Sequence, residues 1–183
     1  MTENLYNGIL SILTAIDLCL ENKLILPALM LIYSSIDIVG SLERKEDEGT
    51  KASFTRWVDN YILKAKPLGC TALELYGARC GILHALAAES DLYKDGKVRM
   101  VIYAWGTAKS DYLKATSKLL ERERDVVVHV LDLTEAFKLG LVNYLIDVNK
   151  DPDRVAIMKS KVEKVFGPLS TSVVSDFLKL FEE

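Results

Sequence analysis

The feature that most constrains the fold is residues 24–41, LILPALMLIYSSIDIVGS, which are apolar in almost every direction that a helix would present. Such a helix has to be covered on most sides, by neighbouring helices or by a subunit interface. Pro27 and Asp37 interrupt the run, which falls short of the roughly 20 apolar residues that span a bilayer. We therefore expect a central helix in a globular bundle and no membrane span.

Helical periodicity continues on both sides of this segment. Apolar residues recur at helical spacing over residues 3–22, and again from Phe54 until Lys66-Pro67 ends the pattern. Asp132 and Glu135 have the spacing of a capping box at the start of a later helix. Helices are also expected over residues 71–89, from Asp132 to Val148, over residues 153–166 and over residues 171–182. The predicted fold is mainly α, an up-and-down helical bundle.

A short β element interrupts the helices. The segments VRMVIYAWG, from Val98, and DVVVHVL, from Asp125, are rich in β-branched and aromatic residues, which is typical of strands. The segment between them, KSDYLKATSKLLERE, has a helical pattern. We predict one domain over residues 1–183, with a helical core (1–90), a β-containing insertion after the fourth helix (91–132) and C-terminal helices (133–183).

Several chemistries find no support in the sequence. GxxxxGK[ST], GxGxxG and HExxH are all missing, so no phosphate-cradling loop or zinc-protease helix is expected. The two histidines, His84 and His129, have no cysteine or carboxylate at metal-ligand spacing. Cys19, Cys70 and Cys80 form no paired framework and suit a reducing compartment. We expect no metal, no cofactor and a cytoplasmic protein.

The charge is weakly negative overall but locally basic. The net charge of −3 makes the whole molecule a poor electrostatic attractant for nucleic acid. Residues 91–124 hold eight basic and five acidic side chains, a local net of +3. This segment is either a solvated face or a patch that contacts an RNA backbone, in which case Lys94, Lys97 and Arg99 are the candidate contacts.

The segment TALELYGARCGILHALAAES carries an arginine and a histidine, Arg79 and His84, inside a run of apolar and small residues. At about 100° per residue, Arg79 lies in an apolar arc of the helix, and His84 lies about 140° away from it. An unpaired arginine in such an arc costs several kcal/mol, and Asp37 of the central helix is a candidate partner. One reading is therefore structural: a buried Arg79–Asp37 ion pair and a histidine hydrogen-bonded to a neighbour.

His84 shares its stripe of the helix with Gly77, Gly81 and Ala88. A stripe nearly bare of side chains allows another backbone to approach closely. Together with the central apolar helix, it predicts a symmetric homodimer with a two-fold axis near the 71–89 helices, because self-complementary surfaces close most simply that way.

The motif RCGILH resembles the Arg-x4-His signature of the HEPN superfamily, which consists of small helical domains, many of them metal-independent ribonucleases. The resemblance covers roughly residues 1–90 and includes a tyrosine before the motif, here Tyr76. It implies that Arg79 and His84 are catalytic and that two subunits pair to line a shared cleft. In active members the residue after the arginine is usually polar, whereas Cys80 occupies that position here.

The resemblance implies an endoribonuclease in which histidine takes the 2′-hydroxyl proton and arginine binds the phosphate, leaving a 2′,3′-cyclic phosphate. Cys80, Asp37 and Tyr76 would be supporting residues. Members of the family act as toxins held by an antitoxin-type protein partner, in antiviral defence or in RNA processing. Two alternatives stay open: a non-catalytic HEPN-like dimer that binds RNA, a nucleotide or a protein, and a purely structural helical dimer.

Overall fold

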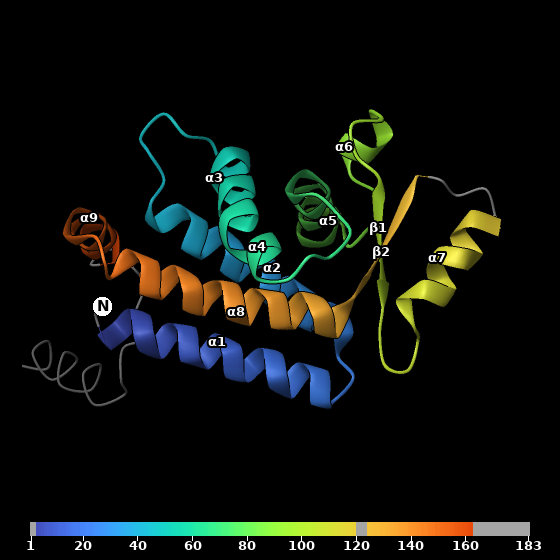
Figure 1. Ribbon diagram of the computed structural model, residues 1–183, viewed down its shortest axis with the longest axis horizontal. Coiled ribbons are helices and arrows are strands. Elements are labelled where there is room, and N and C mark those ends of the chain that lie inside the picture. The colour runs from blue at the N-terminus through green and yellow to red at the C-terminus, as the bar shows by residue number, and fades with distance from the viewer. Residues whose placement is uncertain (1–2, 120–123, 163–183) are drawn as a thin grey trace, which may run out of the picture.

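The computed structural model describes residues 3–119 and 124–162, and Figure 1 shows their arrangement. The described chain is mainly helical, with one small parallel sheet of two strands. This confirms the predicted mainly helical character with a small β element. The helix expected over residues 171–182 lies outside the described residues, and the one expected over 153–166 is described as α9, Pro152–Val162.

The predicted central helix is α2, Ile25–Leu42. It packs against α1 (Glu3–Glu21), α3 (Thr50–Trp57) and α5 (Ala72–Ala85), and also meets the later helices α8 and α9. By length and composition alone α2 is apolar enough to cross a membrane, and half of it is buried within the fold. Its polar interruption, Asp37, pairs with an arginine of α5. Burial against other helices thus accounts for its apolar character.

Helix α3 continues through a π-helical turn, η1 (Val58–Ile62), into the short α4 (Leu63–Ala65). The π turn lies where α8 (Val130–Val148) presses closest. A Cβ on Gly140 of α8 would lie 3.0 Å from the carbonyl carbon and oxygen of Tyr61. Glycine therefore permits this close crossing, because a Cβ here would make a tight contact with the backbone of η1.

The β element follows α5 and the four-residue turn α6 (Asp91–Lys94). Strand β1 (Met100–Ala104) and strand β2 (Asp125–His129) pair in parallel, with Met100 opposite Asp125 and Ala104 opposite His129. Parallel strands need a long crossover, and α7 (Ser110–Leu119) supplies it. Both predicted strands and the helix between them are confirmed. The Tyr103 hydroxyl of β1 hydrogen-bonds the Tyr33 hydroxyl of α2, which ties the sheet to the central helix.

Strand β2 runs directly into α8, and this corrects the expected helix start. The N-cap residue of α8 is His129, whose Nδ1 accepts a hydrogen bond from the Leu131 amide at 3.2 Å. The predicted capping pair, Asp132 and Glu135, lies inside the helix instead. Both carboxylates bind Lys66, at 2.7 and 2.5 Å. The start of α8 that the capping-box spacing predicted was therefore wrong, because β2 leads directly into the helix at Val130.

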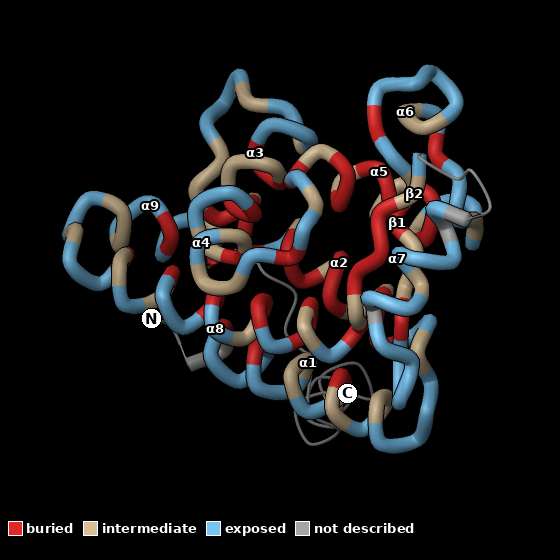
Figure 2. The backbone as a smooth tube through the Cα atoms, turned by 45° about the vertical axis from the view of Figure 1, so that its right-hand side comes forward, coloured by how far each residue is buried: buried red, intermediate tan, exposed pale blue. Residues whose placement is uncertain are grey.

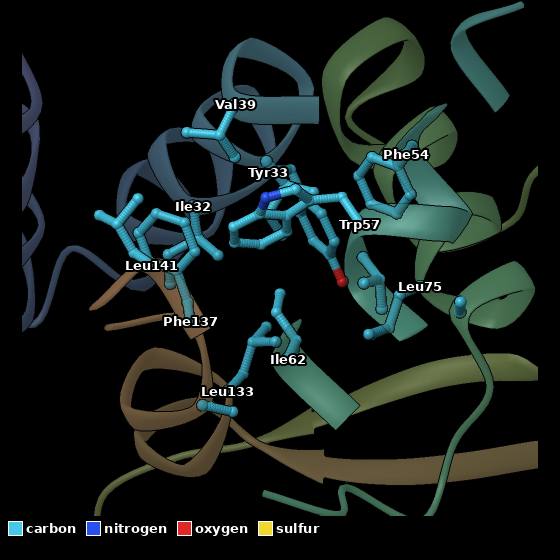
Figure 3. Packing of buried hydrophobic residues seen from close by; sticks show 14 of the residues in the cluster. Ile32, Tyr33, Val39, Phe54, Trp57, Ile62, Leu75, Leu133, Phe137 and Leu141 are labelled. Atoms are coloured by element: carbon cyan, nitrogen blue, oxygen red, sulfur yellow. The ribbon is translucent and has the colours of Figure 1, made fainter. Parts of the chain in front are cut away.

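The main core forms where α2, α3 and α8 meet. Figure 3 shows the Trp57 indole among side chains of α2 and α8, and the centroids of Trp57 and Phe137 lie 6.3 Å apart. Figure 2 shows that the buried residues lie along α2, α5 and the strands, while α7 and the outer face of α9 are exposed. Helix α8 therefore completes the core that the helices of residues 3–85 begin.

Candidate active site on helix α5

Helix α5 is fixed at its N-terminus by a complete capping box. The Glu74 amide donates to Thr71 Oγ1 at 3.2 Å, and the Thr71 amide donates to Glu74 Oε2 at 2.8 Å. Arg99, which follows the turn before β1, grips the same carboxylate through Nε and Nη2, at 2.6 and 3.1 Å. This ion pair fastens the insertion to the start of α5.

The helix ends earlier than the sequence indicated. The expected boundary was residue 89, but α5 stops at Ala85, and Leu86 adopts a left-handed conformation with φ of 49°. The amides of Leu86 and Ala87 both bond back to the Gly81 carbonyl. The chain then turns back over Gly81, and this tertiary contact overrides the local helical pattern.

Arg79 forms the expected ion pair with Asp37. Its Nε and Nη2 lie 2.8 and 2.6 Å from the same oxygen, Asp37 Oδ2. The two side chains are only 13% and 18% exposed, so the pair is largely withdrawn from water. Burial by itself would lower the pKa of Arg79, but the hydrogen bonds and charge of Asp37 outweigh it and raise that pKa. The guanidinium is thus a fixed cation.

The same guanidinium also reaches the histidine. Arg79 Nη1 lies 2.7 Å from His84 Nε2 and 3.9 Å from Cys80 Sγ, and its Cζ stands 5.8 Å from the centre of the Tyr76 ring. Burial, and after it the nearby Cys80, raises the pKa of Tyr76. His84 itself is exposed. Arg79 therefore joins a buried carboxylate on one side to an exposed imidazole on the other.

The contact between Arg79 and His84 defines the state of the imidazole. A guanidinium has donors only, so in a hydrogen bond between the two groups Nε2 is the acceptor and Nδ1 carries the proton. The lone pair that would serve as a base is thus occupied by Arg79 as long as nothing else binds the guanidinium. An anion that accepts hydrogen bonds from Arg79 Nη1 would release it.

The small-residue stripe is covered by the chain itself. A Cβ on Gly81 would lie 2.4 Å from the Ala87 carbonyl oxygen, and one on Gly77 would lie 3.2 Å from atoms of Ser90 and Val98. The backbone of residues 87–89 therefore covers Gly81, and the side chains of Ser90 and Val98 cover Gly77. The stripe thus gives no argument for a second subunit, and the expected homodimer has to rest on other grounds.

Each of the three candidate RNA contacts, Lys94, Lys97 and Arg99, has an acidic partner in the structure. Arg99 binds Glu74, ten residues before His84 and hence about 15 Å away along the helix. Lys94 lies 3.9 Å from Asp91, and Lys97 lies 2.8 Å from Asp95. Each of these basic residues is partly neutralised by an acidic partner. Arg122 of the same basic segment lies outside the described residues.

Sequence reasoning missed a second polar site. A cavity of about 670 Å³ lies against η1, the C-terminal half of α8 and Arg154 of α9. Its residues come from positions 43 to 154, so no local motif marks it.

Within the part of the chain that the structure describes, no group of three or more His, Cys, Asp or Glu side chains could hold a metal ion. No known protein family, curated protein or solved structure matches the chain.

Proposed function

We propose that the chain is a HEPN-like, metal-independent endoribonuclease whose reacting groups are Arg79 and His84. The observation that carries this proposal is the 2.7 Å contact between Arg79 Nη1 and His84 Nε2 at the exposed end of α5. It puts a permanent cation next to a proton acceptor, and the acceptor, His84, is exposed. Asp37 supports the arrangement as a positioning residue, because it holds the guanidinium through Nε and Nη2 and leaves Nη1 for the substrate.

The proposed reaction begins with an exchange of partners. An RNA phosphate accepts hydrogen bonds from Arg79 Nη1, and His84 Nε2 is released. The freed lone pair takes the proton of the adjacent 2′-hydroxyl, and O2′ attacks phosphorus. Arg79 stabilises the charge on the non-bridging oxygens. The bond from phosphorus to O5′ breaks, O5′ takes up a proton from the imidazolium or from water, and the products are a 2′,3′-cyclic phosphate and a 5′-hydroxyl.

A second copy of the chain belongs to this proposal through the HEPN resemblance, in which two motifs line one cleft. The charge of the site is consistent with such pairing. Asp37 neutralises Arg79 within each copy, so a phosphate would be bound more strongly if the guanidinium of a second copy also contacted it. Lys94 and Lys97 remain the proposed backbone contacts. Arg99 is the weakest of the three, since Glu74 already accepts from two of its nitrogens.

The test is cleavage of single-stranded and structured RNA in EDTA by the wild-type, His84→Ala and His129→Asn proteins. His129→Asn is the matched control, because it removes the other histidine and keeps a side chain that can cap α8. We expect His84→Ala to lose activity about 100-fold or more, as is usual for a general base, and His129→Asn to retain it. Equal cleavage by wild type and His84→Ala would refute the proposal.

One observation favours the non-catalytic alternative, a HEPN-like module that only binds RNA. Cys80 stands where active members carry a stronger hydrogen-bonding group, and a thiol is a weak donor. Under this alternative, wild type and His84→Ala both bind RNA and neither cleaves it. Cys80→Asn separates the cases further, because it supplies the missing amide beside Arg79 and should raise the cleavage rate of a weak enzyme.

A further inference from the structure

The cavity beside η1 shares no lining residue with the Arg79–His84 site. It lies where α3 and η1 meet the C-terminal half of α8, and Lys150 and Arg154 also line it. Figure 1 shows this part of α8, together with α9, at the end of the molecule away from the two strands. Whatever binds here is therefore independent of the proposed ribonuclease chemistry.

The cavity arises from the way the two helices cross. At Gly140 the backbone of α8 touches that of η1, with 3.0 Å between the position of a Cβ and the Tyr61 carbonyl. Beside this contact the cavity is lined by Asn60 of η1 and by Asn143 of α8. A π turn is a common device at binding sites, because its extra residue displaces side chains from the regular helical positions.

One wall of the cavity is held by Arg154. Its Nε and Nη2 grip the Glu43 carboxylate at 2.5 and 3.0 Å, and its Nη1 binds Asp147 Oδ2 at 2.8 Å. The Tyr61 hydroxyl completes the network: it accepts from Arg154 Nη2 at 2.8 Å and donates to Asp147 Oδ2 at 2.9 Å. The Arg154 hydrogen bond lowers the pKa of Asp147. Both carboxylates of the lining are thus engaged by Arg154.

The unused hydrogen-bonding groups of the cavity are mainly donors. Arg56 uses Nε and Nη2 for Glu48 and the Glu43 carbonyl, which leaves Nη1 unpaired among the described residues. Lys64 makes one long contact, 3.4 Å to Asn60 Oδ1. Lys150 has no ion pair within residues 3–119 and 124–162.

The charge balance agrees with this count of donors. Four cationic and two anionic side chains line the cavity, a net of +2, and Glu48, the partner of Arg56, reduces it to +1. A ligand that satisfies spare donors in a positive cavity must be an anion with several acceptor oxygens. The volume, about 670 Å³, lies within the range of small-molecule sites and exceeds what one inorganic phosphate fills.

We propose that this cavity binds a small phosphorylated metabolite, with Lys64, Lys150 and Arg56 Nη1 on the phosphate and the amides of Asn60 and Asn143 on the polar body of the molecule. The phosphate chemistry is shared by free nucleotides, sugar phosphates and an RNA backbone. We assign the small molecule, because the volume of about 670 Å³ lies within the range of small-molecule sites.

The test is isothermal titration of the full-length protein with inorganic phosphate, ribose 5-phosphate, a nucleoside triphosphate, the unphosphorylated nucleoside and a short single-stranded RNA. The variant is Lys64→Gln with Lys150→Gln, and the matched control is Lys51→Gln with Lys23→Gln, which removes two exposed lysines outside the cavity. We expect a phosphorylated small molecule to bind wild type and the control equally and the cavity variant at least tenfold more weakly.

Three results would overturn the proposal: no binding by any phosphorylated small molecule, binding that survives in the cavity variant, or cavity-dependent binding of RNA alone. Thermal melting of each variant without ligand separates lost binding from lost folding. Titration of His84→Ala keeps this test apart from the ribonuclease proposal. Its affinity for the small phosphate should equal that of wild type whether or not RNA is cleaved.

Discussion

Removing Asp37 is the most informative perturbation of the Arg79 cluster. Breaking a buried ion pair from one side costs about 3–5 kcal/mol, whereas an exposed pair contributes about 1 kcal/mol or less. Exposures of 18% for Asp37 and 13% for Arg79 put this pair near the buried limit. Only one carboxylate oxygen is engaged, and His84 also accepts from Arg79, so we expect the lower end, about 3 kcal/mol for Asp37→Ala.

The assay is chemical denaturation followed by circular dichroism, with midpoints compared at constant slope. For a chain of this size, about 3 kcal/mol lowers the melting temperature by roughly 6–12 °C. Arg79→Ala should cost a similar amount, because it leaves the Asp37 carboxylate unpaired. The double variant should cost less than the sum of the two, by about 2 kcal/mol, since no charge is then stranded. Single variants within 0.5 kcal/mol of wild type would refute the buried pair.

Three further predictions concern other parts of the fold. Gly81→Ala should destabilise by about 2 kcal/mol or more, because its Cβ would lie 2.4 Å from the Ala87 carbonyl oxygen. Burial by itself would raise the pKa of Glu74, but Arg99 outweighs this effect and lowers that pKa. The stability that this pairing adds is present above the ordinary pKa of 4.5 and disappears as the pH falls below it. Arg99→Gln should lose less stability over the same pH range, because it lacks the pairing. Burial raises the pKa of Cys70 to about 12, so its thiol should resist alkylation at pH 8 in the folded protein.

Each of these has a direct control. Gly8→Ala lies in an open helical position with nothing within 4 Å and should stabilise by about 0.5–1 kcal/mol, so equal effects at both glycines would contradict the packing argument. A stability curve from pH 6 to pH 3 that is identical in wild type and Arg99→Gln would contradict the pairing with Glu74. Rapid labelling of Cys70, measured by mass spectrometry on native protein, would contradict its burial.

The sequence was sufficient for features that depend on composition and periodicity. The all-round apolar character of residues 24–41 predicted a central helix, and β-branched runs predicted both strands. The Asp37–Arg79 pair followed from electrostatics, because a charge in an apolar arc needs a counter-charge and the central helix offered one. These features are local, or they involve a single long-range partner that the cost of burial makes necessary.

Other features depend on which distant segment of the chain lies next to a residue in the folded structure. A stripe of glycines indicates that a backbone comes close, but it does not say whose, and residues 87–98 cover Gly77 and Gly81 where a second subunit was expected. The sequence made Arg99 a candidate RNA contact, and it did not show that the capping carboxylate of Glu74 binds the same guanidinium. The cavity beside η1 could not be predicted from the sequence, because its donors come from separate segments of the chain, between residues 56 and 154. Such assignments require the tertiary structure, because each residue pairs with the group that lies nearest to it and the residue type alone does not identify that group.

The parallel pairing of β1 and β2 makes α7 indispensable, although the described side chains of α7 are exposed or half-buried. Antiparallel strands accept a two-residue turn, but parallel strands require a crossover of about a dozen residues or more. Replacing α7 by a tight turn would reverse β2, and because α8 begins at the next residue, it would send α8 away from the core. A shortened form of this protein must therefore keep residues 100–129 whole or dispense with them entirely.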